Sequence, residues 1–264
     1  MQMCDQHRSG DTFALISLQR YIGTPTMAST GDKLVLYTNN TCTWANRANV
    51  CLTEIGVPFE ERIINVDGPR PAEFLALNPR GLVPVLIFND QLIIESEIIC
   101  QFLCDVYPSH LCPPPTTTEG ALRRAKMRFF IDTYWNKFHT ILFRLFEAPT
   151  KDDEETIVDD AIAGIKKEVG PLLADASPFW GASDRLTLAE VIVGPFVIRA
   201  VLLSKHGVYP FSLNQRIEAE TPEFYRWAIA TSSHPSITRL VEEDVIVKRS
   251  IAKRGRMRAA AGLN

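Results

Sequence analysis

The stretch Thr41-Cys42-Thr43-Trp44-Ala45-Asn46-Arg47 decides how the rest of the chain is arranged. The apolar run before it, Lys33-Leu34-Val35-Leu36-Tyr37, predicts a buried strand. After it, apolar residues recur at helical spacing as far as Ile55, which predicts a helix over 43–56. Cys42 therefore stands where a strand ends and a helix begins. At such a place the free backbone N–H groups and the helix dipole stabilise a thiolate.

The pattern after this helix continues to alternate between strands and helices. Strands are predicted over 59–64, 83–88 and 91–94, and helices over 72–77 and 96–106. The pair Asn89-Asp90 between the last two strands is a hairpin signal. The order predicts a small α/β domain in which the first two strands are parallel and the last two are antiparallel.

A run of prolines, Pro113-Pro114-Pro115, marks a linker, and long helical patterns follow it. They predict helices over 117–147, 153–177, 187–206, 222–232 and 236–244, with no strand after residue 112. Thr187-Leu188-Ala189-Glu190 fits a capping box. The predicted domains are an α/β domain over 32–112 and an all-helical domain over 113–247. Residues 1–31 are predicted to be a disordered extension, and 248–264 a basic, partly frayed tail.

Composition and charge narrow the class of protein. The chain has 264 residues, 46% of them hydrophobic, and its net charge of -3 gives no electrostatic case for binding nucleic acid. No apolar run reaches the roughly 18 residues that a membrane span needs. The six cysteines, in a chain without a signal-peptide pattern, predict reduced thiols and a cytoplasmic location. No cysteine or histidine set has the spacing of a zinc site, so no metal is predicted.

Two later features stand where they could form a site together with Cys42. Val83-Pro84 opens a strand, a position that tolerates proline, and the bond between them could be cis. Glu95-Ser96 opens a helix, where N–H groups and a hydroxyl could bind the carboxylate of an amino-acid head group and the glutamate its ammonium. Each feature also has a purely structural interpretation, namely an edge proline, a helix cap and a buried cysteine.

The order of these features resembles the N-terminal domain of the cytosolic glutathione transferases. The shared features are a strand, a cysteine at a helix start, the pattern N-P-x-G-x-V-P over Asn78–Pro84, and E-S opening a helix. The resemblance covers 33–112 closely and extends more loosely to the helical half. There Leu186–Glu190 looks like the family's capping motif, with glutamate in place of its usual aspartate. This resemblance implies a thioredoxin-like α/β domain followed by an all-α domain.

The cysteine stretch is similar to two classes of that family. Thr41-Cys42-Thr43-Trp44 resembles the Ser-Ser-Cys-Ser-Trp signature of the zeta class, the glutathione-dependent maleylacetoacetate isomerases. In that class a serine hydroxyl stabilises the glutathione thiolate; Asn40 matches this serine, and Thr41 follows it. The stretch also resembles the Cys-Pro-Phe-Ala start of the omega class, whose cysteine forms a mixed disulfide with glutathione. Cys42 matches that cysteine, while Thr43 replaces the proline. The thiolate stabiliser is therefore Cys42, Thr41 or Asn40.

Carried over position by position, the resemblance implies a binding site for glutathione. The backbone of Val83, with Pro84 after it, would pair with the cysteinyl part of glutathione. Glu95 and Ser96 would hold the γ-glutamyl end, and Arg70 would meet the glycine carboxylate. A homodimer is implied as well. Glutathione would be the co-substrate or cofactor.

The resemblance also implies an enzyme that activates the glutathione thiol for addition to an electrophilic, unsaturated small molecule. The outcome would be conjugation or cis–trans isomerisation. An omega-like thiol reductase using Cys42 and a non-catalytic glutathione-binding module are the alternatives. The aromatic candidates for the second-substrate pocket, expected between the domains, are Trp44, Phe129, Tyr134, Trp135 and Phe138. Most of the last four also have an interpretation as core residues.

Overall fold

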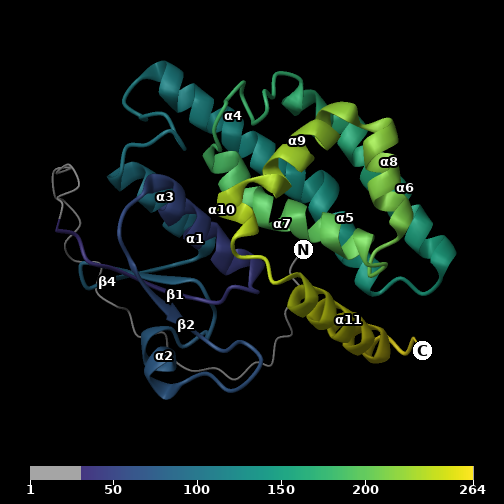
Figure 1. Ribbon diagram of the computed structural model, residues 1–264, viewed down its shortest axis with the longest axis horizontal. Coiled ribbons are helices and arrows are strands. Elements are labelled where there is room, and N and C mark those ends of the chain that lie inside the picture. The colour runs from purple at the N-terminus through teal and green to yellow at the C-terminus, as the bar shows by residue number, and fades with distance from the viewer. Residues whose placement is uncertain (1–30, 264) are drawn as a thin grey trace, which may run out of the picture.

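The computed structural model describes residues 31–263, so the extension predicted over residues 1–31 lies outside the described residues apart from Gly31. The first half contains all four described strands (Figure 1). They are β1 (Leu34–Thr38), β2 (Glu60–Ile63), β3 (Val85–Phe88) and β4 (Gln91–Ile94), with helices α1 (Thr43–Ile55), α2 (Ala72–Leu77) and α3 (Ser96–Val106). This order confirms the predicted thioredoxin-like α/β arrangement.

The four strands form one mixed sheet in the order β2-β1-β3-β4. β1 is parallel to β2 and antiparallel to β3, and β3 is antiparallel to β4. The hairpin between β3 and β4 turns through Asn89 and Asp90, whose φ angles of 46° and 64° are both left-handed, as a tight hairpin turn requires. Both the parallel unit and the hairpin are confirmed.

β1 is buried along its whole length, and its side chains alternate between two apolar clusters. Leu34 and Leu36 pack into the cluster that contains α1 and α3. Val35 and Tyr37 pack on the other side with Phe74 of α2. The turn that leaves β1 therefore emerges from between two packed layers, and this fixes the start of α1.

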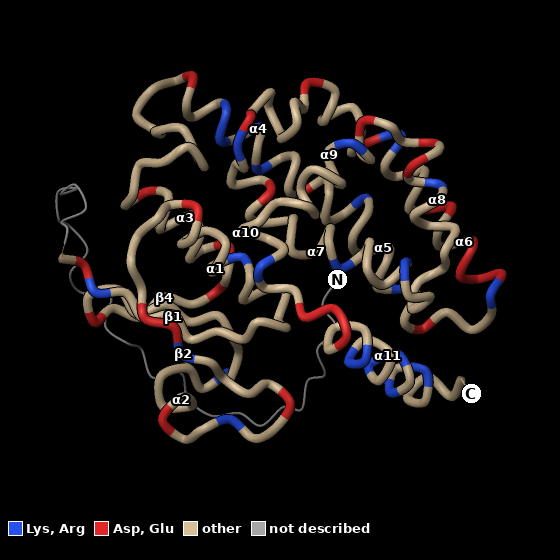
Figure 2. Tube along the Cα trace, viewed as in Figure 1, with Lys and Arg blue, Asp and Glu red and all other residues tan. Residues whose placement is uncertain are grey.

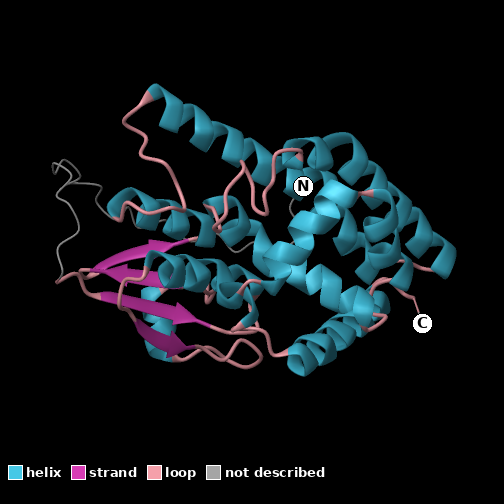
Figure 3. Ribbon diagram, turned by 45° about the horizontal axis from the view of Figure 1, so that its top comes forward, coloured by secondary structure: helices cyan, strands magenta, loops and turns pink. Residues whose placement is uncertain are grey.

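The second half is helical, as predicted, and gathers at the opposite end of the molecule from the sheet (Figure 3). Its helices are α4 (Thr118–Tyr134), α5 (Thr140–Phe143), α6 (Lys151–Gly164), α7 (Leu188–Lys205), α8 (Phe211–Glu220), α9 (Pro222–Ser233), α10 (Pro235–Thr238) and α11 (Glu243–Ala260). A π turn at Trp135–His139 joins α4 to α5. Among the helices of residues 31–263, none combines the length and apolarity that crossing a bilayer requires.

Two predictions for the C-terminal part are wrong. The helix predicted over 236–244 is interrupted, because α10 and α11 are separate helices. The basic tail is not frayed but belongs to the 18-residue helix α11. Its cations have partners in other elements: Arg254 pairs with Glu154, and Arg258 donates to the carbonyl of Ala148. The domain boundaries themselves stay a prediction.

α7 connects the helical half to the first helix of the α/β half. Most of its residues are buried, and it packs against α1 on one side and against α4 and α9 on others. The capping box predicted for its start is present between Thr187 and Glu190. Across the interface, Nε of Arg47 in α1 donates to the carbonyl of Ile192 at 2.8 Å. α1 is thereby held from both halves of the molecule.

Candidate functional site

A cavity of about 410 Å³ opens where the starts of α1 and α3 approach the segment before β3. It brings together all the residues predicted to bind glutathione, namely Arg70, Val83, Pro84, Glu95 and Ser96, and adds Cys42 and Trp44. These residues lie in separate elements, so their convergence is a property of the fold. We call this space the first cavity.

Val83 contributes its backbone to the first cavity. The Val83–Pro84 peptide bond is cis. The ladder of β3 begins at Val85, which pairs with Tyr37 and Ile94. The N–H and C=O of Val83 lie outside that ladder, and Val83 lines the first cavity. The predicted backbone contact is compatible with this arrangement.

Glu95 holds an unusual backbone conformation at the start of α3. Its φ of 71° and ψ of 118° are rare for a residue with a side chain and cost on the order of 1–3 kcal/mol. Strained residues of this kind cluster at active and ligand-binding sites. The Glu95 carboxylate pairs with Arg80, which also lines the first cavity and which the sequence pattern does not predict as a site residue.

Ser96 is the first residue of α3 and is only 6% exposed. Its Oγ accepts a hydrogen bond from Nη1 of Arg47 at 3.2 Å. Because one lone pair of Oγ is held in this way, the hydroxyl hydrogen is left to be donated to a ligand. The unpaired N–H groups of the first turn of α3 point the same way as the helix dipole and favour a carboxylate there.

The three candidate thiolate stabilisers occupy the turn between β1 and α1 but differ in what they face. The hydroxyl of Thr41 donates to Oδ1 of Asn39 at 2.7 Å, so its hydrogen is engaged inside the turn. Asn40 lines neither cavity, and its carbonyl accepts from Asn46 at 3.0 Å. Cys42, the N-cap of α1, makes no side-chain capping bond and lines both the first cavity and the one beside it.

That neighbouring space, which we call the second cavity, has a volume of about 450 Å³ and lies between the two halves. The start of α1, the loop after β2, α7 and α11 line it. It shares Cys42, Trp44 and Val66 with the first cavity. Trp44 thus lines a cavity between the two halves, and its contact with a second substrate stays a prediction. Trp135 does not line the cavity itself, but its ring stacks on the ring of Trp44, with the two centroids 5.2 Å apart.

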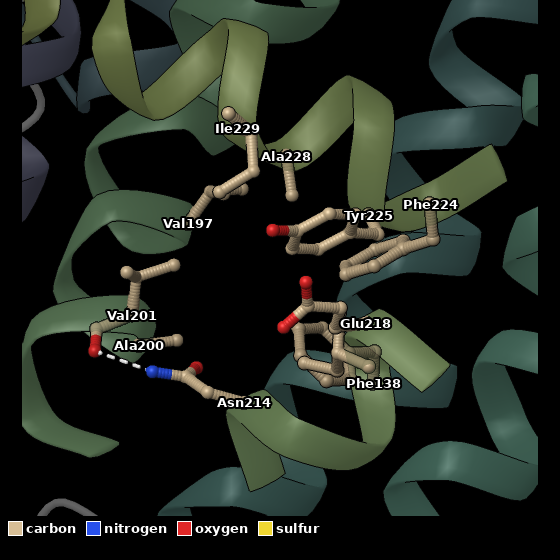
Figure 4. A pocket seen from close by; sticks show the side chains of 11 residues that line it. Phe138, Val197, Ala200, Val201, Asn214, Glu218, Phe224, Tyr225, Ala228 and Ile229 are labelled. Carbon is tan, nitrogen blue, oxygen red and sulfur yellow. Dashed lines mark hydrogen bonds between the residues drawn. The ribbon is translucent and has the colours of Figure 1, made fainter. Parts of the chain in front are cut away.

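Three aromatic residues predicted for the second-substrate pocket lie elsewhere. Phe129 is 60% exposed on α4, and Tyr134 is fully buried in the core. Phe138 lines a separate cavity of about 190 Å³ between α7, α8 and α9 (Figure 4). The structure does not bring them to the second cavity, which His139, Phe143 and Phe146 line instead, and their role in substrate binding stays a prediction.

Two arginines shape loops around the cavities. Arg70 donates to the carbonyls of Asn65, Gly68 and Gly81 at 3.0, 2.7 and 2.9 Å and so fixes the loop before α2. Its predicted contact with the glycine carboxylate stays a prediction. Arg199 of α7 was not expected at the site; its Nη2 donates to the carbonyl of Thr41 at 2.6 Å. This bond ties the thiol-bearing turn to the helical half.

His139 is an uncharged member of the second cavity. It is 4% exposed, and its Nδ1 lies 3.4 Å from the hydroxyl of Tyr134. Burial, together with the nearby charges of Arg47 and Arg199, lowers the pKa of His139 to about 3. The imidazole therefore stays neutral at pH 7 and adds no positive charge to the cavity.

Replacing His139 with phenylalanine should make the fold less sensitive to acid. An unfolded histidine titrates near 6.5, above the folded pKa of about 3, so the unfolded state binds the proton first as the pH falls. Between pH 7.5 and pH 5 this costs the wild type about 2 kcal/mol of stability. Urea unfolding at the two pH values should show that extra loss in the wild type and not in His139→Phe; equal losses would contradict the assignment.

Among residues 31–263, no group of three or more histidine, cysteine, aspartate or glutamate side chains is placed to hold a metal ion. The polar groups that line the two cavities include a thiol, hydroxyls, carboxylates and cations.

The thioredoxin-like domain, the cis bond before Pro84 and the helical second half define the architecture of a glutathione transferase. The family model described as "Glutathione S-transferase, N-terminal domain" matches residues 36–114. A protein of Aplysia californica named "Probable glutathione transferase" is 33% identical over 93 residues, which are 95% of that protein and 35% of this chain. The chain belongs to the glutathione S-transferase family.

Two further comparisons cover more of the chain. Glutathione S-transferase omega-1 of Sus scrofa is 27% identical over 206 residues, which are 78% of this chain and 79% of that protein. The structure of rice GST1 in complex with glutathione superimposes with a TM-score of 0.70 at 21% identity. It covers 85% of this chain and 97% of the rice chain, and it shows the shared fold.

Proposed function

We propose that this protein binds glutathione in the first cavity and presents its thiol to an electrophile in the second. Glu95 and Ser96 hold the γ-glutamyl end, and the backbone of Val83 pairs with the cysteinyl part. The observation that supports this best is the junction at Cys42, because the two cavities meet there and share its side chain. The rice relative is described in complex with glutathione.

The proposed chemistry begins with the thiol at the start of α1. There the N–H groups and the helix dipole favour the thiolate, and the proton is released to solvent. The sulfur attacks the β-carbon of an unsaturated carbonyl compound, and a C–S bond forms. The π electrons of the alkene move to the carbonyl oxygen, and water then protonates the α-carbon to give the conjugate. Because both reactants are held in adjoining cavities, less translational and rotational entropy is lost on reaching the transition state, and the activation free energy falls.

The same addition leads to isomerisation when it is reversed before protonation. The former double bond rotates in the enolate, the thiolate leaves, and the alkene reforms with the opposite geometry and free glutathione. Incubation with glutathione and a panel of unsaturated carbonyl compounds separates the two outcomes. A product heavier by glutathione shows conjugation, and an unchanged mass with altered geometry shows isomerisation.

A thiol reductase is the second candidate, and the exposure of Cys42 to both cavities favours it. In that reaction the Cys42 thiolate attacks a glutathionyl disulfide and releases the other thiol as its thiolate. A second glutathione thiolate then attacks the mixed disulfide, giving glutathione disulfide and free Cys42. The omega-1 relative at 27% identity supports an omega-like placement, whereas the isomerase outcome would support the zeta class.

The variants Cys42→Ser and Cys42→Ala distinguish these mechanisms. For addition to an alkene we expect Cys42→Ser to keep kcat/KM within about 10-fold, because its hydroxyl still donates to the glutathione thiolate. Cys42→Ala should lose about 10- to 150-fold, since one hydrogen bond to a charged group contributes about 1.5–3 kcal/mol. Both variants should lose any reduction of glutathionyl disulfides.

Steady-state rates and glutathione binding by calorimetry provide the measurements. If Cys42→Ser abolishes alkene addition while glutathione still binds, an obligatory cysteine intermediate is indicated, and the first mechanism fails. If the wild type does not bind glutathione at all, the proposed function fails. The homodimer implied by the family resemblance stays a prediction, and so does the cytoplasmic location expected from the cysteines.

A further inference from the structure

Four cysteines lie together in the core, away from the two cavities. Cys51 belongs to α1, Cys100 and Cys104 belong to α3, and Cys112 ends the segment that leads from α3 to the proline linker. All four are free thiols in one apolar cluster. None of the four lines either cavity, so the proposed function makes no use of them.

The four thiols differ in their distance from the surface. Cys51 and Cys100 are 0% exposed, and the Cys51 thiol donates a hydrogen bond to the carbonyl of Cys100 at 3.8 Å. Cys104 and Cys112 are each 6% exposed, and Asp105, which follows Cys104, is exposed. A small oxidant therefore has a shorter path to Cys104 and Cys112 than to the other two thiols.

The chain turns back after α3 so that Cys112 meets the end of that helix. The backbones of Ser109 and Cys112 form an antiparallel bridge, which closes the turn. The carbonyl of Leu111 accepts from the N–H of Leu188 at 2.8 Å and fixes the turn against the start of α7. In this arrangement the thiol of Cys112 donates a hydrogen bond to the sulfur of Cys104.

Arg124 of α4 holds the same two segments together by separate contacts. Its Nη2 pairs with the carboxylate of Asp105, the residue after Cys104. Its Nη1 donates to the carbonyl of Pro113, the residue after Cys112, at 3.3 Å. Figure 2 shows basic positions along α4 and acidic positions on α3. One guanidinium group thus keeps the chain positions that carry the two sulfurs next to each other.

The same contacts give the two thiols different acidities. The hydrogen bond from Cys112 and the charge of Arg124 lower the pKa of Cys104, while burial opposes them. The pKa of Cys112 is raised, because its thiol is the donor and is buried. A nucleophilic sulfur therefore lies beside a protonated partner, which is the arrangement of a thiol that oxidises next to a second, resolving thiol.

We propose that Cys104 and Cys112 form a site of reversible oxidation, at which a hydroperoxide converts the two thiols into an intrachain disulfide. The Cys104 thiolate attacks the outer oxygen of the hydroperoxide. The O–O bond breaks, the alkoxide leaves as an alcohol with a proton from solvent, and Cys104 becomes a sulfenic acid. The Cys112 sulfur then attacks the Cys104 sulfur, and hydroxide leaves as water with the Cys112 proton.

The two steps balance, since the two thiols lose two electrons and the hydroperoxide gains them. A small thiol reverses the reaction by exchange: its thiolate attacks the disulfide, and a second thiol molecule resolves the mixed disulfide. The bond would tie the end of α3 to the segment that leads into α4.

Peptide mapping of the full chain tests the proposal. The chain is treated with hydrogen peroxide in the absence of glutathione, its remaining thiols are alkylated, and it is cleaved before aspartate. Cleavage before Asp105 separates peptide 90–104 from peptide 105–131, so only a disulfide keeps them joined. We expect the joined peptides in the oxidised chain and their loss after treatment with dithiothreitol. Complete oxidation of Cys42, which lines both cavities, without any joined peptides would overturn the proposal.

Single variants identify the two sulfurs, because Cys100 lies on the same peptide as Cys104. Cys100→Ala should keep the joined peptides, and Cys104→Ala should lose them. In Cys112→Ala, Cys104 has no resolving partner and should gain oxygen instead. Joined peptides in Cys104→Ala would assign the bond to Cys100 and contradict the proposal. The map of the wild type needs no variant, so the test holds even if one variant does not fold.

Arg124→Gln tests the role of the arginine. It should slow formation of the disulfide by about 3- to 10-fold, because the charge that stabilises the Cys104 thiolate is removed. Arg123→Gln is the matched control, since Arg123 lies on the same helix and donates instead to the carbonyl of Gly181 at 2.8 Å. Equal rates in the two variants would contradict the role of Arg124. These measurements require neither glutathione binding nor catalysis, so their result is independent of the proposed function.

Discussion

Replacing Glu190 with alanine should lower the free energy of unfolding by about 3–5 kcal/mol. The Glu190 side chain is completely buried, and its carboxylate accepts four hydrogen bonds. Two come from the N–H and the hydroxyl of Thr187, at 2.9 and 2.7 Å. The others come from the N–H of Trp180 at 2.9 Å and from the indole of Trp227 at 2.7 Å. Alanine would leave these buried donors without an acceptor, which accounts for the size of the loss.

Urea unfolding followed by tryptophan fluorescence measures the effect. Glu119→Ala is the matched control, since Glu119 also lies in the first turn of a helix but is exposed. It should change stability by only about 0.3–1 kcal/mol. Glu190→Asp should fall between these values, because the shorter side chain keeps the cap at Thr187 and no longer reaches Trp227. A loss below about 1 kcal/mol in Glu190→Ala would show that the four bonds contribute little.

The first half of the molecule could be predicted from the sequence because its signals are local. The helix after Cys42 has an unbroken helical period and ends at Gly56, where φ is 77°. Asn89 and Asp90 are residues that favour a hairpin turn. Glu95 and Ser96 indicate the start of α3. That Cys42, Val83 and Ser96 would meet at one cavity was expected only from the resemblance to a known family. No single spacing in the sequence specifies that these residues lie close together.

The part of the second cavity that α11 lines could not be predicted, because the position of α11 depends on contacts between distant segments. Arg254, which holds α11 in place, pairs with Glu154, 100 positions earlier. A run of lysine and arginine gives the same sequence pattern whether it is solvated or anchored in this way. The π turn at Trp135–His139 likewise has no signal in an apolar pattern, so the sequence does not show which residues after it face the cavity. α8 was also missed, since its sequence is mostly polar and Phe211, which begins it, is exposed.

Ser96→Ala should weaken glutathione binding by about 10- to 150-fold, because the lost bond is one between a hydroxyl and a carboxylate. Arg47 makes the serine an effective donor: its Nη1 occupies a lone pair of Oγ, and the hydrogen is left for the ligand. Arg47 is 2% exposed, and its Nη2 has no hydrogen-bond partner within residues 31–263. The alanine variant removes the acceptor of Nη1 as well, so stability should also fall, by about 1–3 kcal/mol.

A double-mutant cycle shows whether Arg47 acts on glutathione through Ser96. Burial lowers the pKa of Arg47 to about 10, so it remains charged at pH 7, and the rings of Trp44, Trp135 and Phe196 surround it at 4.6–5.0 Å. Arg47→Met fills much of the same volume without the donor. If Arg47 positions the serine hydroxyl, Arg47→Met weakens glutathione binding, and adding it to Ser96→Ala causes little further loss. Calorimetric titration of the four proteins decides the point: losses that simply add would mean that Arg47 supports the fold and has no part in orienting Ser96.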